Sequence, residues 1–216
     1  MYAFVAQLIG LALWRLLGQH ATVAQLIVGT WGETGAKVTV LTSLLLASSG
    51  VALRIWGSSY LHATTVWAAD STSQRLVISG PFRFVRNPLY LGNVLFMAAF
   101  TPLSTPPGAL LLLFTVVTLS MALARYEENY LRMTFGVAYV EYAAAVPALV
   151  PRITPIFGNR SRANLLAGIR AEIFMFGLFA GLLGYLSGSP YALWIWGLGL
   201  IVGILAQRWA LVTEKT

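Results

Sequence analysis

The sequence predicts an all-α fold, a polytopic bundle of five or six transmembrane helices, and three observations support this prediction. Apolar residues make up 58% of the 216 residues and charged residues only 10%, whereas about 25% of the residues in a typical soluble domain are charged. The apolar residues fall into stretches close to the roughly 17–25 residues that a helix needs to cross the hydrocarbon layer. Most of the basic residues lie between these stretches.

The expected spans, in chain order, cover about residues 3–28, 38–56, 88–101, 108–124, 171–186 and 191–206. The first is interrupted by Arg15, Gln19 and His20, so the sequence leaves open whether residues 1–30 form one span or a broken one. The third is short, and we expect it to tilt or to stop before the far interface. The chain then divides into residues 1–37 with the N-terminal span or spans, a core at 38–155, and a C-terminal hairpin at 156–216.

The positions of the Arg residues predict the orientation of the spans, because short cytoplasmic loops accumulate basic residues. They flank or occupy the connections 54–86 and 125–170, whereas the turns 102–107 and 187–190 carry no charge. We therefore expect an integral protein of a bacterial or archaeal inner membrane, with both charged connections in the cytoplasm. The N-terminus has no basic region before its apolar run, so we expect a retained span rather than a signal peptide.

The net charge of +7 does not indicate nucleic acid, because the basic residues do not form a stripe on a soluble fold. Anionic lipid or an anionic ligand explains them better. The chain has no cysteine, which excludes disulfides, thiolate metal sites and cysteine nucleophiles, and we expect no metal.

Two glycine pairs lie in the last two predicted spans, Gly177 with Gly181 and Gly199 with Gly203. Each is a GxxxG pattern, which lets helix backbones approach closely in lipid. The pattern is typical of packing within one hairpin, and the alternative is a homodimer through the same faces.

The connection before the third span carries basic residues at the point where the next helix is expected to begin. Asn87 suits the N-cap and Pro88 the first position of a helix, where a missing N–H costs nothing. The positive end of the helix dipole then lies beside Arg86, which predicts an anion site. The alternative is that Asn87 and Pro88 only start a helix while Arg83 and Arg86 contact lipid phosphate.

Two adjacent acids, Glu127 and Glu128, follow the fourth span. Neighbouring helical residues point about 100° apart, so the two carboxylates cannot share one partner. Glu128 can pair with Arg132 or Arg125 on the helix surface, which leaves Glu127 for a ligand. Acids this close to hydrocarbon are candidates for function, although a solvated helix face remains the alternative.

Gly136 is expected to end that helix, and the spacing of Tyr139 and Tyr142 places both rings on one side of the next short helix. The rings either line a pocket or sit at the lipid headgroups. Prolines at 147 and 151 then extend the chain as far as Arg152. These features together suit a ligand with a carboxylate, an amine and a flat ring, and S-adenosylmethionine is one such ligand.

Residues 80–92 read Gly-Pro-Phe-Arg-Phe-Val-Arg-Asn-Pro-Leu-Tyr-Leu-Gly, and Glu-Glu at 127–128, Phe-Gly-x-x-Tyr-x-x-Tyr from 135 and Val-Pro-x-x-x-Pro-Arg from 146 follow in that order. With Leu-Arg-Ile-Trp at 53–56, this order resembles the isoprenylcysteine carboxyl methyltransferases and the related phospholipid N-methyltransferases, over about residues 44–155. The resemblance implies a membrane enzyme with a cytoplasmic-facing cofactor pocket of short helices and loops. Such an enzyme binds S-adenosylmethionine, releases S-adenosylhomocysteine and methylates a small lipid-embedded substrate, a prenylcysteine-type carboxylate or a lipid headgroup.

Carried over residue by residue, the resemblance implies cofactor binding by Arg86, Asn87, Pro88, Tyr90, Gly92, Glu127, Glu128, Tyr139 and Tyr142, and catalytic roles for Glu127, Glu128 and Arg152. Arg86 with the helix N-terminus would hold the methionyl carboxylate, and one of the two acids the amine. The chain departs from the family where Asn87 replaces the usual His, which removes a titrating group. It also has Ala144 and Ala145 where prenylcysteine enzymes often carry basic residues.

Two other functions stay open. Membrane sterol and enone reductases carry a similar Arg-x-Pro-x-Tyr segment but use NADPH, whose extra phosphate favours basic residues over an acidic pair. A scaffold without enzymatic activity is the second alternative. Transport is disfavoured because the spans are almost wholly apolar.

Overall fold

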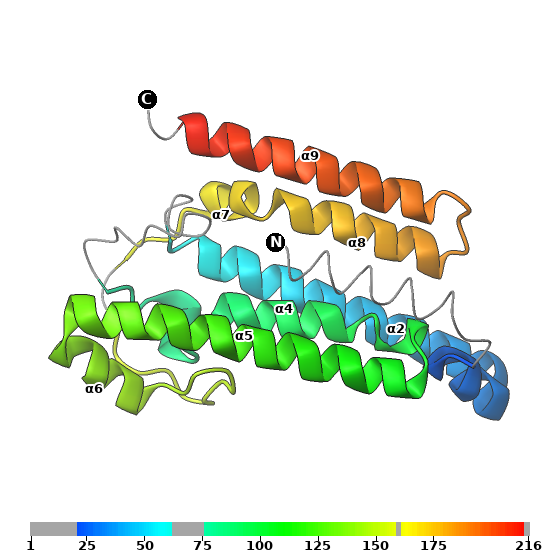
Figure 1. The fold of residues 1–216 in the computed structure, drawn as a ribbon, viewed down its shortest axis with the longest axis horizontal. Coiled ribbons are helices and arrows are strands. Elements are labelled where there is room, and N and C mark those ends of the chain that lie inside the picture. The colour runs from blue at the N-terminus through cyan, green and yellow to red at the C-terminus, as the bar shows by residue number, and fades with distance from the viewer. Residues whose placement is uncertain (1–20, 62–75, 159–160, 214–216) are drawn as a thin grey trace. The chain divides into compact units, whose positions relative to one another are not determined.

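The computed structural model of the chain describes residues 21–61, 76–158 and 161–213, and within them every regular element is helical, which confirms the all-α fold. In chain order the elements are α2 (Val23–Ser58), η1 (Gly80–Arg83), α4 (Pro88–Ala98), η2 (Thr101–Leu103), α5 (Pro106–Phe135), α6 (Val137–Ala145), α7 (Leu165–Ala171), α8 (Ile173–Leu186) and α9 (Ala192–Thr213) (Figure 1).

Contacts divide the chain into two compact units. The first contains residues up to Gly50 and Asn93–Leu123, and the second contains Val51–Gly92 and Ala124–Thr216. Helices α2, α4 and α5 each contribute one end to each unit. Every predicted site residue falls in the second unit.

The first unit joins the start of α2 to the turn between α4 and α5. The backbone N–H of Val23 donates to the carbonyl of Ser104 at 2.8 Å. Phe96 and Phe100 are buried, with ring centroids 5.5 Å apart in a tilted arrangement. This unit therefore has its own apolar core.

Helix α2 is interrupted at Gly32, within a stretch where the sequence predicts a connection between two spans. Residues 29–37 are rich in Gly and polar residues and were expected to link two spans, but they are helical except at Gly32, whose φ of 56° turns the chain. Glu33 and Lys37 stabilise the helix after the break through an i,i+4 ion pair of 2.7 Å. The predicted span at 38–56 therefore starts earlier, and most of the predicted first span lies outside the described residues.

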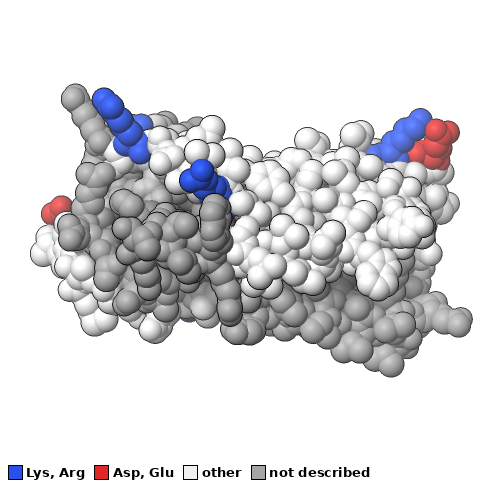
Figure 2. All heavy atoms as spheres, turned by 90° about the horizontal axis from the view of Figure 1, so that it is seen from above, with Lys and Arg blue, Asp and Glu red and all other residues white. Residues whose placement is uncertain are grey.

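The number of spans is smaller in the described residues than the five or six predicted. Helices α2 and α5 are long and apolar enough to cross a membrane, and α7 with α8, bent by 62°, makes a third if counted as one span. Helix α4 has 11 residues, or roughly 16 Å at about 1.5 Å per residue, which is too short to cross. On the face drawn in Figure 2, most of the described surface carries neither acidic nor basic side chains, as expected of a protein with apolar membrane helices.

Helices α8 and α9 form an antiparallel hairpin (Figure 1). A Cβ atom on Gly177 would lie 2.4 Å from the Cα of Gly199, and one on Gly181 would overlap the ring of Trp196. The indole N–H of Trp196 donates to the carbonyl of Leu178 at 2.8 Å. The predicted packing within the hairpin is confirmed, and because Gly203 also faces Phe174, a homodimer through these glycine faces is not supported.

The glycine contact predicts a position-specific loss of stability. Replacing Gly177 with Val should destabilise the hairpin by about 1–3 kcal/mol, because the new side chain overlaps the α9 backbone. Gly197→Val is the matched control, since nothing lies within 4 Å of a Cβ at Gly197. Thermal unfolding of the purified protein in detergent measures the difference. Equal melting temperatures for the two variants would contradict the hairpin contact.

Candidate functional site

The site begins where α4 starts. Pro88 is the first residue of the helix and Asn87 precedes it, as the sequence predicted. The carbonyl of Asn87 accepts the N–H of Leu91 at 3.0 Å, so Asn87 occupies the N-cap position. Its side-chain nitrogen, however, donates to Glu128 at 2.7 Å and to the carbonyl of Ala148 at 3.1 Å. Asn87 therefore connects α4 to α5 and to the segment after α6.

The two charged connections lie side by side. The backbone N–H groups of Arg86 and Asn87 donate to the carbonyls of Pro147 and Ala148 at 2.9 and 3.2 Å, and the N–H of Arg152 donates to the carbonyl of Phe84 at 3.0 Å. These bonds join segments about 60 residues apart in the chain. Because the prolines that follow α6 keep this stretch extended, its carbonyls remain available to the start of α4.

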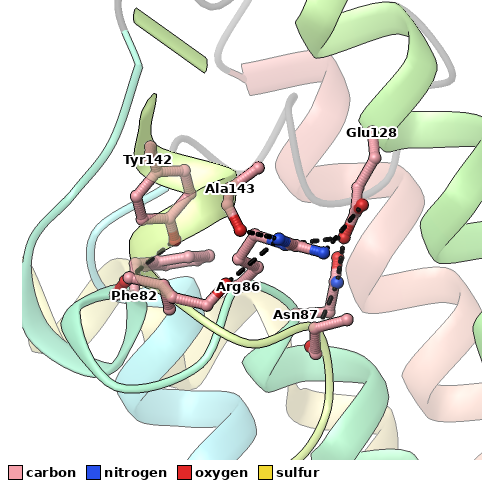
Figure 3. A network of polar contacts seen from close by, with 8 residues as sticks. Phe82, Arg86, Asn87, Glu128, Tyr142 and Ala143 are labelled. Atoms are coloured by element: carbon pink, nitrogen blue, oxygen red, sulfur yellow. Dashed lines mark hydrogen bonds and ion pairs between the residues drawn. The ribbon is translucent and has the colours of Figure 1, made fainter. Parts of the chain in front are cut away.

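The Arg86 guanidinium is the centre of a polar network (Figure 3). Its Nε and Nη2 donate to the two carboxylate oxygens of Glu128 at 3.1 and 3.2 Å. Its Nη1 donates to the carbonyls of Ala143 and Val146. The side chains of Arg86 and Glu128 are only 16% and 13% exposed, so this pair joins α5, α6 and the start of α4 with little screening by water.

Glu127 has a different partner from Glu128, as the 100° separation predicted. The hydroxyl of Tyr90 on α4 donates to its carboxylate at 2.6 Å. Among the described residues, no basic side chain forms an ion pair with Glu127. The predicted surface pairing of Glu128 with Arg132 or Arg125 is wrong, because Glu128 turns to Arg86 instead.

Tyr139 and Tyr142 lie on the buried face of α6, with ring centroids 6.0 Å apart. The Tyr142 hydroxyl donates to the carbonyl of Phe82 at 2.8 Å. Burial and the nearby Glu128 carboxylate raise the pKa of Tyr139, and burial raises the pKa of Tyr142, so both hydroxyls keep their protons at neutral pH. The rings pack in the protein, which excludes the alternative of headgroup contact for these two residues.

The Tyr139 hydroxyl is the exception in this otherwise bonded cluster. Tyr139 is 1% exposed, and its oxygen has no hydrogen-bond partner among the described residues. A buried polar atom without a partner is costly and calls for an explanation such as a bound ligand or water.

The other predicted site residues occupy the same unit without joining the network. Arg152 donates through Nη1 to the carbonyl of Ala145 at 2.7 Å and is half-buried. Gly92 is buried within α4, one turn after Pro88. Arg152 thus holds the end of α6 rather than either of the two acids.

Sequence reasoning missed one buried acid. Glu172, at the bend between α7 and α8, is 0% exposed and pairs with Arg54 at 2.7 Å. The available signal was an ionisable residue at the start of a strongly apolar stretch, which by default marks a functional or structural contact. The Arg54 partner could not be chosen from spacing, because 118 residues separate the two.

These features define a helical membrane protein in which a bonded Arg, two acids and buried tyrosines come together at the ends of three helices. Residues 38–138 match the model of the phospholipid methyltransferase family. That segment contains the start of α4 and both acids, whereas Tyr139, Tyr142 and Arg152 follow it.

Three curated proteins show similarity to this chain. The cobalt-zinc-cadmium resistance protein CzcN of Cupriavidus metallidurans is 28% identical over 150 residues, 67% of this chain and 64% of that protein. The nickel-cobalt-cadmium resistance protein NccN of Alcaligenes xylosoxydans xylosoxydans is 27% identical over 150 residues, 67% of this chain and 65% of that protein. Protein-S-isoprenylcysteine O-methyltransferase B of Arabidopsis thaliana is 31% identical over 96 residues, 44% of this chain and 48% of that protein.

The alignments span less than two thirds of the length of each of these relatives. No solved structure matches the chain. The family match and the isoprenylcysteine methyltransferase relative support the resemblance seen in the sequence, and both cover less than half of the chain.

The Arg86 network predicts that Lys is not an adequate replacement for Arg at this position. Arg86→Lys should lower the free energy of unfolding by about 1.5–3 kcal/mol, because an ammonium cannot bond both Glu128 oxygens and the α6 carbonyls together. Arg125→Lys is the control, since Arg125 is exposed on α5. Denaturant titration in detergent measures both. A stability loss equal to that of the control would show that the fork geometry is unimportant.

Proposed function

We propose that the chain is an S-adenosylmethionine-dependent methyltransferase that acts on a small lipid-embedded substrate from the cytoplasmic side of the membrane. The observation that carries this proposal is the pairing pattern of the two acids. Glu128 is neutralised by Arg86, whereas Glu127 has only the Tyr90 hydroxyl as a partner among the described residues.

The charges of the site fit the positive end of this donor. A carboxylate at the edge of an apolar layer attracts a cation more strongly than the same group in bulk water. Glu127 is exposed and so can be reached by the amine or the sulfonium of the donor. Arg86 is occupied by Glu128 and two carbonyls, so we assign it to holding Glu128 and Asn87 in place rather than to the methionyl carboxylate.

The buried Tyr139 hydroxyl is a second feature that fits a bound polar ligand. It is protonated at neutral pH and has no partner among the described residues. Its natural role in this proposal is to donate a hydrogen bond to an acceptor on the donor molecule. Tyr142, by contrast, is fixed to Phe82 and keeps α6 in position.

Methyl transfer places modest demands on the protein. The sulfonium of the donor supplies an electrophilic methyl group, so the chain must align the acceptor with the carbon–sulfur bond and exclude water. Alignment of this kind contributes up to about 7–11 kcal/mol. The Arg86–Glu128 ion pair and the hydrogen bonds of Asn87 join the start of α4 to α5 and to the segment after α6, and so hold the site residues in place for this alignment.

The nature of the acceptor decides whether a base is needed. A carboxylate attacks as an anion, whereas an ammonium headgroup must first lose a proton. Glu127 is the candidate base, because Glu128 is held in its ion pair and is less able to accept a proton.

A binding prediction separates this function from the NADPH and scaffold alternatives. S-Adenosylhomocysteine should raise the melting temperature of the purified protein, because a ligand that binds the folded state stabilises it, whereas NADPH should not. Glu127→Gln should weaken this binding by about tenfold, which corresponds to roughly 1.4 kcal/mol. Glu141→Gln is the matched control, since Glu141 is exposed on α6. Stabilisation by NADPH alone would favour a reductase, and no stabilisation by either ligand would favour a scaffold.

A labelling experiment identifies the acceptor. The protein is incubated with methyl-labelled S-adenosylmethionine and either total lipid extract or a prenylcysteine, and each product is then treated with mild alkali. A methyl ester releases labelled methanol, whereas an N-methyl group keeps its label. We expect a labelled lipid-soluble product in one arm; absence of label in both arms would contradict the proposed reaction.

A further inference from the structure

The last two turns of α2 lie between the start of α4 and the α7–α8 bend. A Cβ on Gly57 would lie 2.6 Å from the Leu89 side chain, and one on Gly168 would lie 2.7 Å from the carbonyl oxygen of Ile55. The N–H of Asn164 also donates to the carbonyl of Ser59 at 2.7 Å. Glycines thus allow close approach on two sides of the same helix end.

A buried ion pair occupies this junction. Arg54 donates through Nε and Nη2 to the two oxygens of Glu172 at 2.7 and 3.0 Å, and the Ser58 hydroxyl donates to Glu172 at 2.6 Å. The Arg54 guanidinium also lies 5.6 Å from the centroid of the Phe174 ring. Glu172 therefore accepts three hydrogen bonds, and its two bonds from Arg54 fix the orientation of the guanidinium.

The remaining end of that guanidinium reaches the functional site. Nη1 of Arg54 donates to the carbonyl of Leu89 at 3.3 Å. Leu89 lies in the first turn of α4 and immediately precedes Tyr90, whose hydroxyl bonds Glu127. A continuous set of contacts thus runs from Glu172 through Arg54 and the first turn of α4 to Glu127.

We propose that Arg54 and Glu172 are positioning residues, through which the C-terminal α7–α8 segment fixes the Tyr90–Glu127 contact. Glu172 lies outside the segment that matches the methyltransferase family, so this role adds a part of the chain to the site. The inference rests on the proposed function in that Glu127 is taken to meet the methyl donor.

A purely structural role explains the geometry less well. A buried ion pair is weak as a source of stability, because well-packed apolar residues of similar size often replace it without loss. The pair also uses a planar fork to bond Glu172 and Leu89 at the same time, which a structural pair alone does not require. A positioning role for Arg54 therefore accounts for its hydrogen bond to the Leu89 carbonyl, which the ion pair with Glu172 does not explain.

Two variants separate positioning from stability. Arg54→Lys keeps a positive charge opposite Glu172 but cannot bond Glu172 and the Leu89 carbonyl together. The double variant Arg54→Met with Glu172→Leu removes both charges and keeps the volume. Glu33→Gln is the control, because it breaks an exposed ion pair in the other unit.

Two measurements are made on the whole 216-residue chain in detergent. Calorimetry gives the affinity for S-adenosylhomocysteine, and the 19F spectrum of 3-fluorotyrosine incorporated at position 90 reports the surroundings of that ring. We expect both Arg54 variants to lose affinity by roughly tenfold or more, with KM for the donor raised more than kcat is lowered, and to shift the 19F signal. The control should match the wild type in both measurements.

Wild-type affinity and an unshifted 19F signal in the folded double variant would overturn the inference. If the double variant does not fold, Arg54→Lys decides by the same two measurements. If the wild type does not bind S-adenosylhomocysteine, the proposed function fails, and the 19F signal alone then decides whether Arg54 positions Tyr90.

Discussion

The bidentate ion pair between Arg86 and Glu128 is the interaction on which the site depends. Both oxygens of Glu128 are occupied, and the third guanidinium nitrogen bonds carbonyls at the end of α6. Because the pair is largely buried, leaving either charge alone would be costly. One side chain thus holds α5, α6 and the start of α4 together, and Asn87 adds bonds from the start of α4 to Glu128 on α5 and to Ala148 after α6.

Local sequence signals predicted the helix ends well. Pro88 begins α4, and Gly136 separates α5 from α6 with a positive φ of 53°. Proline and glycine have strong backbone preferences of their own, so these helix ends could be predicted without knowledge of tertiary contacts. The connection at residues 29–37 was predicted in the right place but too long, for a physical reason. Residues 29–37 have the composition of a loop, yet a single turn at Gly32 and the Glu33–Lys37 pair allow helix on both sides of it.

Partners across the chain were harder to predict than positions. The 100° rule separated the two acids correctly but offered Glu128 only neighbours on its own helix, and the structure gives it Arg86, 42 residues away. Glu172 was missed for the same reason, since its partner is fixed by the packing of Gly57 and Gly168 rather than by spacing. Periodicity describes a helix face, whereas the contact opposite that face depends on tertiary structure.

The internal pairing also determines which ligand charge the site favours. Arg86 is neutralised by Glu128, Arg54 by Glu172, and Arg152 bonds a backbone carbonyl. Glu127 is then the acid of this network that a ligand can reach without displacing a buried ion pair. In the proposed function, Glu127 attracts the cationic end of the methyl donor, because water screens charges weakly beside an apolar layer. Under the same proposal, the acceptor approaches on the side of the bound cation that faces away from Glu127, unless Glu127 itself removes the acceptor's proton.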